Sequence, residues 1–265
     1  MKAAATLLAL IQALNLTLTQ PQQDTLVLDG REYVLTFEDD FNGTQLDLTK
    51  WERCPEWKRQ DLNNHWDDDM SWLDGEGNLV IGMEYDEATD RYNSGAVRSK
   101  GLFEQQYGYF EIRCTVNTVP GYWTAFWLMS ESVVSEDNGG TDGTEIDIYE
   151  SAYYGQSLIQ HTLNWDGYGE AHKAEGQKVL ANVYDGEYHT FSLLWTEDEY
   201  VFYIDGRETW RTDAAAAEGT SRVPAYLKIT SEMGSWTSWH DGIVSKYDLP
   251  DVMKVDYVRI YAENK

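Results

Sequence analysis

Residues 143–150 read Gly-Thr-Glu-Ile-Asp-Ile-Tyr-Glu, and this stretch decides how the chain is expected to fold. Successive side chains of a β-strand point to opposite faces of its sheet. Ile146 and Ile148 would therefore point into an apolar core, whereas Glu145 and Asp147 would point the other way. The pattern predicts a strand with one apolar face and one acidic face.

The end of the same stretch breaks the strict alternation. A regular strand would place Tyr149, not Glu150, on the acidic face. One extra residue between Asp147 and Glu150, a β-bulge, would return Glu150 to that face, and such bulges often lie beside active sites. We therefore predict a bulged strand that presents three carboxylates on one side.

Further strand-like runs extend along the chain in both directions and are separated by turn signals. An Asp-Gly pair at 205–206 suits the positive φ angles of a type I′ hairpin. Many short strands with almost no helix predict an all-β fold, a sandwich of two curved antiparallel sheets with a concave cleft. The clearest of these runs are Tyr33–Phe37, Asn78–Met83, Tyr107–Val116, Tyr122–Met129, Phe191–Trp195, Tyr200–Ile204 and Val255–Tyr261.

Composition narrows the class of ligand. The 265 residues carry a net charge of −26, together with 11 Trp, 18 Tyr and 7 Phe. Nucleic acids and anionic membranes are poor partners for such a chain, because binding phosphate needs a basic surface. A groove lined by Trp and Tyr suits sugar rings, whose C–H faces pack on aromatic side chains. The composition therefore favours a neutral glycan.

The N-terminus differs from the rest of the chain. Lys2 precedes a mostly apolar stretch, 3–18, and a polar segment follows it. We interpret residues 1–24 as a signal peptide or N-terminal tail; a short amphipathic helix is the alternative. No break in composition divides residues 25–265, which we expect to form one domain. Cys54 and Cys114 could pair in an oxidising compartment, but their spacing does not show it.

The three acids allow more than one chemistry. Retaining glycoside hydrolysis needs two carboxyl groups about 5–5.5 Å apart, one as nucleophile and one as acid and then base. Neighbours on one face of a strand can supply such a pair, and like charges this close raise one pKa. An acidic surface open to solvent and a calcium site remain alternatives to catalysis.

The acidic stretch, Glu145–Glu150, resembles the active-site signature of glycoside hydrolase family 16 in its bulged form. Similar motifs occur in the order typical of that family, over about residues 33–262. These are Phe37–Gly43, Tyr107–Arg113, Trp123–Met129, Tyr188–Gly206 and Val255–Tyr261. The resemblance implies a β-jelly roll and endo-acting, retaining hydrolysis of a β-linked polysaccharide.

The resemblance also implies a role for individual residues. Glu145 would be the nucleophile, Asp147 its hydrogen-bonding assistant and Glu150 the general acid and base. Trp123 matches a sugar-stacking position. A structural calcium on the convex face would be held by Asp256 and Glu38, and the chemistry itself would need no cofactor.

The substrate implied by the resemblance is a β-1,3-glucan or a mixed β-1,3/1,4-glucan. Three departures from the glucan-cleaving pattern keep other substrates open: Thr124, Asn164 and the loop Ser231–Trp236. An endo-β-galactan hydrolase is the first alternative, and Trp127 lies in a segment similar to galactan-cleaving relatives. A non-catalytic glycan-binding jelly roll is the second.

Further cleft residues are predicted from aromatic and amide side chains near the acids and in polar loops. His161 is equally consistent with a contact to substrate and with a structural role. Asn64 and Trp66 lie in an acidic stretch that is either a cleft rim or a solvated loop. The full set of predicted substrate-binding residues is Trp123, Trp127, His161, Asn164, Trp165, Trp236, Asn64 and Trp66. We expect a secreted monomer that binds polysaccharide and neither nucleic acid nor membrane.

Overall fold

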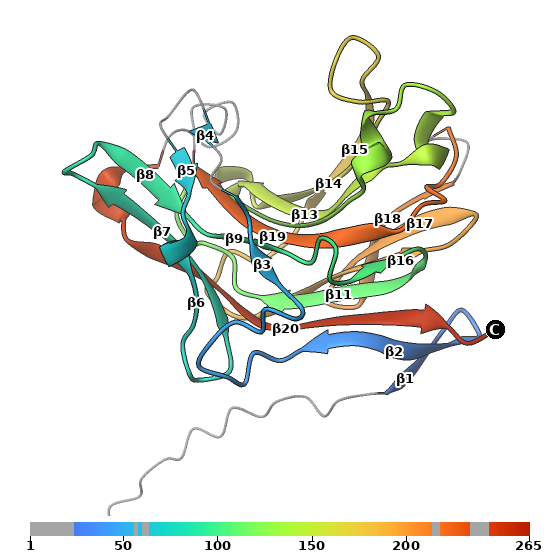
Figure 1. Cartoon of the computed structure of the whole chain (residues 1–265), viewed down its shortest axis with the longest axis horizontal. Coiled ribbons are helices and arrows are strands. Elements are labelled where there is room, and N and C mark those ends of the chain that lie inside the picture. The colour runs from blue at the N-terminus through green and yellow to red at the C-terminus, as the bar shows by residue number, and fades with distance from the viewer. Residues whose placement is uncertain (1–23, 56–57, 60–63, 214–217, 234–243) are drawn as a thin grey trace, which may run out of the picture.

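The computed structural model describes residues 24–55, 58–59, 64–213, 218–233 and 244–265. Their strands form two sheets stacked face to face, as in a β-jelly roll (Figure 1). We call the eight-stranded sheet the cleft sheet and the twelve-stranded sheet the outer sheet. The predicted all-β sandwich is confirmed. No helix in the described residues has the length and apolar character needed to cross a membrane.

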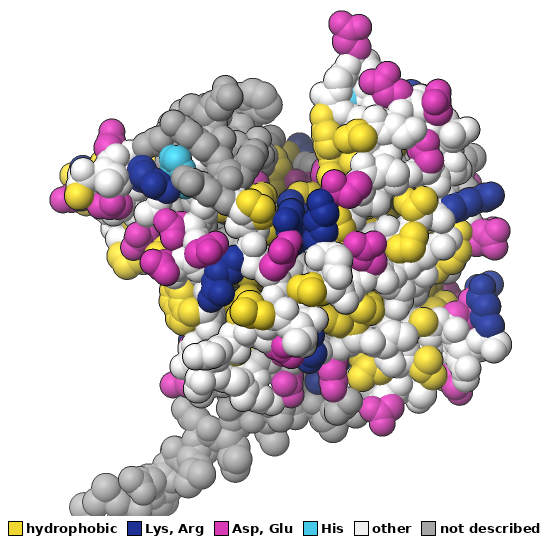
Figure 2. All heavy atoms as spheres, viewed as in Figure 1, with side chains coloured by type: hydrophobic (Ala, Val, Ile, Leu, Met, Phe, Trp, Pro, Cys, Tyr) yellow, Lys and Arg dark blue, Asp and Glu magenta, His cyan; other side chains and the backbone are white. Residues whose placement is uncertain are grey.

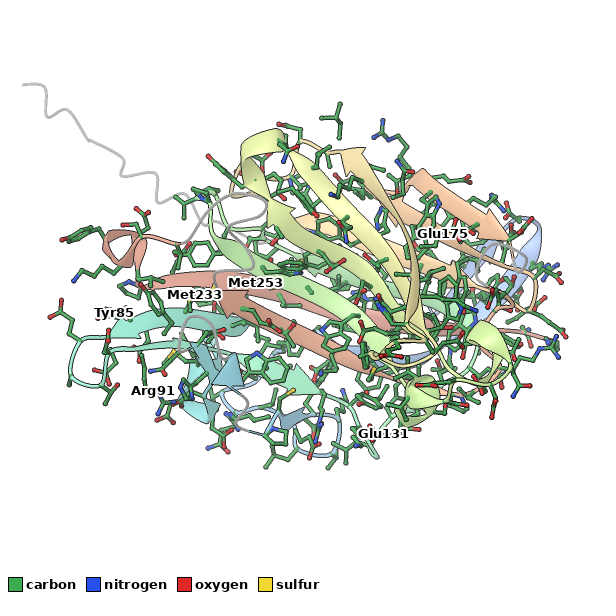
Figure 3. The ribbon with its side chains drawn as sticks, turned by 90° about the horizontal axis from the view of Figure 1, so that it is seen from above. Tyr85, Arg91, Glu131, Glu175, Met233 and Met253 are labelled. Atoms are coloured by element: carbon green, nitrogen blue, oxygen red, sulfur yellow. The ribbon has the colours of Figure 1, made fainter. Side chains whose placement is uncertain are left out.

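The cleft sheet has the strand order β15-β14-β13-β12-β19-β9-β3, with β10 paired to β19 at one end. In Figure 3 this layer is seen from above, with Tyr85 and Arg91 toward one end of the molecule and Glu131 and Glu175 toward the other. Its strands are β3 (Glu52–Arg53), β9 (Ala96–Arg98), β10 (Glu104–Gln105), β12 (Tyr122–Met129), β13 (Glu145–Tyr153), β14 (Leu158–Trp165), β15 (Lys173–Leu180) and β19 (Ala225–Met233).

The outer sheet has the order β18-β17-β16-β11-β20-β7-β8-β5-β4, with β1, β2 and β6 paired at its margins. Its strands are β1 (Thr25–Leu28), β2 (Arg31–Asp39), β4 (Lys58–Arg59), β5 (Asn64–Trp66), β6 (Ser71–Leu73), β7 (Leu79–Asp86), β8 (Arg91–Ser94), β11 (Gly108–Cys114), β16 (His189–Trp195), β17 (Glu199–Ile204), β18 (Arg207–Asp213) and β20 (Asp251–Glu263). Strand pairing is antiparallel except between β5 and β8, which run parallel in the described residues.

Short 3₁₀ turns connect the strands. They are η1 (Asp68–Met70), η2 (Glu131–Val134), η3 (Gly139–Asp142), η4 (Tyr154–Gln156) and η6 (Lys246–Asp248). The hairpin between β17 and β18 turns at Asp205 and Gly206, which have φ angles of 50° and 70°. Both residues have the positive φ that a type I′ turn requires, as their sequence predicts.

The core lies between the two sheets. Ile146 and Ile148 are fully buried there, as their alternation predicts, together with Phe110, Phe126 and Trp195. Burying apolar surface contributes about 25 cal/mol per Å², so this layer is the main source of stability. It fixes the orientation of β13, and therefore the side on which its acids emerge.

The two cysteines do not form a disulfide. Both are buried and free. Cys114 lies in the main core beside the Tyr149 hydroxyl, whereas Cys54 packs with Trp66 and Ala96 in a separate cluster. Burial raises the pKa of both thiols, Cys54 to about 11 and Cys114 to about 12. Neither thiol is therefore poised to react as a thiolate.

Candidate active site

The acidic strand β13 is bulged as its sequence predicts. Asp147 pairs with Thr162 of β14 and Glu150 pairs with Gln160, so three steps along β13 match two along β14. The register toward β12 shifts at the same place. The extra residue brings Glu150 to the face that carries Glu145 and Asp147.

Glu145 is held by two neutral donors. The amide of Asn164 donates to its Oε1 at 3.0 Å, and the hydroxyl of Tyr168 donates to its Oε2 at 2.5 Å. Burial raises the pKa of Glu145, while Tyr168, the ammonium of Lys228 and Asn164 act in the opposite direction. These groups favour an ionised carboxylate against the cost of burial.

Glu150 has a different set of partners. The indole N–H of Trp123 lies 2.9 Å from Oε1, the hydroxyl of Thr162 lies 2.6 Å from Oε2, and Gln160 Nε2 lies 3.1 Å from Oε2. Burial outweighs these contacts and, with the charge of Glu145, raises the pKa of Glu150 to about 7. Glu150 can therefore hold a proton at neutral pH and release it.

Asp147 lies between the two glutamates. Its Oδ2 accepts from the same Asn164 amide, at 3.0 Å, that contacts Glu145. Burial raises its pKa well above the usual range, and the charges of Glu150 and Glu145 raise it further. The raised pKa favours the protonated form of Asp147, in which repulsion among the three neighbouring acids is smaller.

The acids lie in a cleft of about 830 Å³ on the cleft sheet. Aromatic rings and polar side chains surround them, which is the usual make-up of a small-ligand or glycan site. The lining residues are Pro55, Trp66, Arg98, Trp123, Ala125, Trp127, Met129, Glu145, Asp147, Glu150, Gln160, Thr162, Asn164, Tyr168, Lys228, Thr230 and Glu232.

Four of the predicted substrate-binding residues, Trp123, Trp127, Asn164 and Trp66, line this cleft. Their polar atoms are engaged by the protein. Besides the contacts of Trp123 and Asn164 above, Trp127 Nε1 donates to Thr230 Oγ1 and Trp66 Nε1 donates to a backbone carbonyl. The indole rings are therefore fixed as platforms rather than free to reorient.

Two predicted residues of β14, His161 and Trp165, belong to the core instead. Residues of β14 alternate between the two faces, and both side chains are buried on the face away from the acids. His161 binds the Ile148 carbonyl and Thr209, at 2.6 and 2.9 Å. Burial lowers its pKa to about 4. The predicted substrate contact of His161 is wrong, and so is that of Trp165.

Asn64 is also structural. Its amide nitrogen donates to the Tyr92 carbonyl and the Ser94 hydroxyl, both at 3.1 Å, and its oxygen accepts the Met233 N–H. With 1% of its surface exposed, it joins strands rather than binding substrate, which corrects the prediction. The remaining predicted residue, Trp236, lies outside the described residues, as do residues 1–23 of the predicted signal peptide or tail.

The predicted calcium ligands, Asp256 and Glu38, both have partners within the protein. Asp256 is paired with Arg113 at 2.5 Å, so a guanidinium already occupies its carboxylate. The backbone carbonyl of Glu38 accepts from Lys50. Among the described residues, no group of three or more His, Cys, Asp or Glu side chains could hold a metal ion. The structural calcium stays a prediction.

The family model described as "Beta-porphyranase A-D, GH16 domain" matches residues 32–263. The chain belongs to glycoside hydrolase family 16. The match covers both sheets and every acid of the cleft, so the predicted family is confirmed.

Curated relatives include both glucan- and galactan-cleaving enzymes. The chain is 26% identical to glucan endo-1,3-β-glucosidase A1 of Niallia circulans, over 86% of this chain and 38% of that protein. It is 27% identical to keratan-sulfate endo-1,4-β-galactosidase of Sphingobacterium multivorum, over 87% of this chain and 55% of that protein. The chain thus spans between about a third and about half of the length of these family 16 relatives.

A solved family 16 structure resembles the whole domain. The crystal structure of SCLam, a non-specific endo-β-1,3(4)-glucanase, aligns with a TM-score of 0.72 and 27% sequence identity. The alignment covers 88% of this chain and 92% of that chain. The fold is therefore shared over nearly the complete length of both.

Sequence reasoning missed several cleft residues of this family 16 domain. Gln160 and Thr162 could have been found, because they lie four and two residues before Asn164, respectively, and so share its face of β14. Tyr168 comes from the loop after β14, and Lys228 from β19, a strand distant in sequence. No local pattern predicts that the Tyr168 hydroxyl reaches Glu145 or that the charge of Lys228 acts on it.

Proposed function

We propose that this protein is a retaining endo-β-glycanase, with Glu145 as nucleophile, Glu150 as general acid and base, and Asp147 as an assisting acid. One observation carries the proposal. A bulge places three acids on one face of β13 inside an aromatic cleft, and each acid accepts a hydrogen bond from a neighbouring side chain. A surface acidic strand would need neither the bulge nor these partners.

In the first step Glu150 donates its proton to the glycosidic oxygen while a carboxylate oxygen of Glu145 attacks the anomeric carbon. The bond between this carbon and the glycosidic oxygen breaks, and the leaving sugar departs with the proton. A covalent glycosyl-enzyme remains on Glu145. Its formation uses Glu150 in the protonated form, which a pKa of about 7 makes available near neutrality.

In the second step Glu150, now ionised, removes a proton from water. The water oxygen bonds to the anomeric carbon and the bond to Glu145 breaks. Glu150 is thereby reprotonated and Glu145 returns as a carboxylate. Two displacements at one carbon retain its configuration. A sugar hydroxyl in place of water would give transglycosylation by the same route.

For the substrate, a β-1,3-glucan or mixed β-1,3/1,4-glucan is the first candidate, supported by the Niallia circulans relative and by SCLam. A β-galactan is the second candidate, supported by the description of the family model and by the Sphingobacterium multivorum relative. Aromatic platforms such as Trp123 and Trp127 fit either sugar.

Residues 1–24 are proposed to direct secretion, and the domain to act as a monomer. The basic Lys2 followed by an apolar stretch supports the first proposal. N-terminal sequencing of protein recovered from the culture medium tests the cleavage. Retention of the intact segment in that protein would contradict it.

The activity is tested by release of reducing ends from laminarin, mixed-linkage glucan, agarose, porphyran and keratan sulfate. We expect the native protein to cleave at least one polymer internally and NMR to show retained β-configuration in the first product. E145Q should lower kcat by about 10⁴-fold or more, as removal of a nucleophile does in other enzymes. The matched control is E187Q, an exposed acid outside the cleft.

Two results would contradict the proposal. Binding without release of reducing ends from any polymer would identify a non-catalytic glycan-binding protein. Parent-like hydrolysis by E145Q would remove Glu145 from the role of nucleophile.

A further inference from the structure

The side-chain amide of Asn164 contacts two of the three acids at once. Its Nδ2 donates to Glu145 Oε1 and to Asp147 Oδ2, both at 3.0 Å. An amide nitrogen carries two N–H groups, so both are engaged by these contacts. The double contact exists only when the nitrogen of the amide, and not its oxygen, faces the acids.

The shape of an amide does not fix that orientation. A half-turn of the group exchanges its nitrogen and oxygen and leaves its outline almost unchanged. In the turned form Glu145 would lose a donor. The amide oxygen would instead accept a hydrogen bond from Asp147, whose raised pKa favours its protonated form. The orientation that serves Glu145 therefore needs support from the other side of the amide.

His172 provides this support. Its Nε2 lies 3.1 Å from Asn164 Oδ1. An amide oxygen accepts hydrogen bonds and donates none, so Nε2 carries the hydrogen of this contact, as it does in the imidazolium and in one neutral tautomer. If the amide turned, two N–H donors would face each other. The contact therefore favours the orientation in which both N–H groups of Asn164 reach the acids.

His172 also lies beside a second donor to Glu145. Its ring centroid is 6.0 Å from that of Tyr168, with 34° between the two ring planes. This separation is within the range of packed aromatic pairs. The hydroxyl of Tyr168 donates to Glu145 Oε2. One histidine thus lies against Asn164 and Tyr168, two side chains that hydrogen-bond to the proposed nucleophile.

The loop that follows β14 holds this histidine in place. The Gly167 N–H donates to a backbone carbonyl of η2 at 2.7 Å. Asp166, at the start of the loop, pairs with Lys173, the first residue of β15, at 3.1 Å. The His172 N–H donates to the Gly169 carbonyl at 3.3 Å and closes a turn within the loop. The ion pair joins the two ends of the loop, so the imidazole approaches Asn164 from an anchored backbone.

We propose that His172 is a positioning residue for hydrolysis. By donating to the Asn164 oxygen, it keeps the amide turned so that the amide nitrogen donates to Glu145 and Asp147. This inference rests on the proposed glycanase function and extends the catalytic machinery to a loop residue outside the acidic motif. His172 acts through Asn164 and takes no part in the bonds that form or break.

The effect of His172 should be visible in the ionisation of Glu145. The hydrogen bond from Asn164 lowers the pKa of Glu145, against the effect of burial. Without His172 the amide would spend part of its time turned, and this pKa would rise. Glu145 must be ionised to attack, so the acid limb of kcat/KM should move to higher pH. The other titratable groups that act on Glu145 or share its face are Tyr168, Lys228, Glu232, Asp147 and Glu150.

Two replacements of His172 separate the donor from the ring. H172F keeps a ring beside Tyr168 but has no donor for Asn164, whereas H172Q supplies an amide donor at a similar reach. We expect H172F to move the acid limb to higher pH by about half a unit and H172Q to restore most of this shift. His172 is exposed, so neither change opens a cavity in the core. The melting temperature of each variant identifies any loss of folding.

A double-mutant cycle shows whether His172 acts through Asn164. N164A should move the acid limb by at least as much as H172F, and adding H172F to N164A should move it no further. The matched control is H189F, which removes a histidine bound to Asp185 and Asp205 outside the cleft. It should leave both limbs unmoved.

A direct measurement of the pKa of Glu145 does not depend on turnover. NMR of isotope-labelled carboxyl groups follows this pKa, and the Glu145 signal is the one that E145Q lacks. We expect the pKa to rise by about half a unit in H172F and to return toward the native value in H172Q.

The inference is overturned if H172F leaves the pKa of Glu145 unmoved, if H172F shifts it equally in the N164A protein, or if H172Q fails to restore it. A loss of kcat in H172F at every pH with unmoved limbs would also overturn it, because that result indicates a purely structural role. The glycanase proposal fails separately, when the native protein releases reducing ends from no polymer. The NMR titration then still decides whether His172 positions the amide.

Discussion

Glu145, which is half-buried, and Glu150, which is buried, lie on the same face of one strand, yet their surroundings differ. Glu145 is contacted by Asn164 and by the loop residue Tyr168, and an ammonium lies nearby. Glu150 is contacted by Trp123, Thr162 and Gln160, all neutral side chains of the sheet. The nearby cation favours the ionised form of Glu145, whereas no cation is among the main influences on Glu150.

This difference indicates how two identical side chains can take opposite roles. A nucleophile must be ionised, and the donors and the cation around Glu145 act in that direction. A general acid must hold a proton at working pH, and the pKa of about 7 at Glu150 meets that need. Asp147 lies between the two, and burial together with the charges of both glutamates raises its pKa well above its usual range.

Replacing the general acid, Glu150, is the strongest test of the difference between the two glutamates. E150Q should lower kcat on polysaccharide by about 10²–10⁴-fold, because the leaving oxygen is no longer protonated. An aryl glycoside whose leaving group needs no proton should lose much less in the first step, seen as a burst of released phenol. An equal loss on both substrates would show that Glu150 does not act as the acid.

Removing the hydroxyl of Tyr168 tests the surroundings of the nucleophile, Glu145. Y168F keeps the ring but deletes the donor to Glu145, so the pKa of Glu145 should rise. Because Glu145 must be ionised, the acid limb of kcat/KM should move to higher pH, by about half a unit to one unit. The alkaline limb serves as the internal control. A uniform loss of activity with unmoved limbs would assign Tyr168 a purely structural role.

A smaller effect, on the alkaline limb of the pH profile, is expected when a partner of Glu150 is removed. T162V removes a hydrogen bond that lowers the pKa of Glu150, so this pKa should rise above about 7. Activity is lost as pH rises through this pKa, because the proton is then absent. The alkaline limb should therefore move to higher pH by about half a unit. Movement of the acid limb instead would exchange the two roles.

The sequence predicted the part of the site that depends on one strand. The alternation of acidic and apolar residues predicted the core positions of Ile146 and Ile148 and the acidic face. The bulge was predicted because Glu150 is out of phase with this alternation. The same rule also separates His161 from Asn164, since residues three apart on a regular strand point to opposite faces. Predicting both as cleft residues was inconsistent with that rule.

Other features depend on contacts between distant segments. Tyr168 reaches Glu145 from a loop, and loop geometry does not follow from local pattern. Asn64 has the polarity of a binding residue but is buried by strands β8 and β19, which lie far along the chain. A polar residue in a polar segment can equally well join strands, and only the tertiary structure decides between these uses.

The net charge has little bearing on the cleft itself. Acidic side chains are spread over the face shown in Figure 2, with basic side chains between them. The cleft itself is lined by side chains of both charges, with acidic residues on β13 and basic residues on β19 and β9. The arrangement of charged side chains in the cleft, rather than the net charge of −26, should govern which glycan binds.

The alternation along β14 also bears on how specificity could change. Gln160, Thr162 and Asn164 face the cleft, while the residues between them are packed in the core. A library that varies only these three positions would explore the surroundings of both glutamates without opening cavities between the sheets. Selection for a new sugar could therefore proceed along this strand with little loss of folding stability.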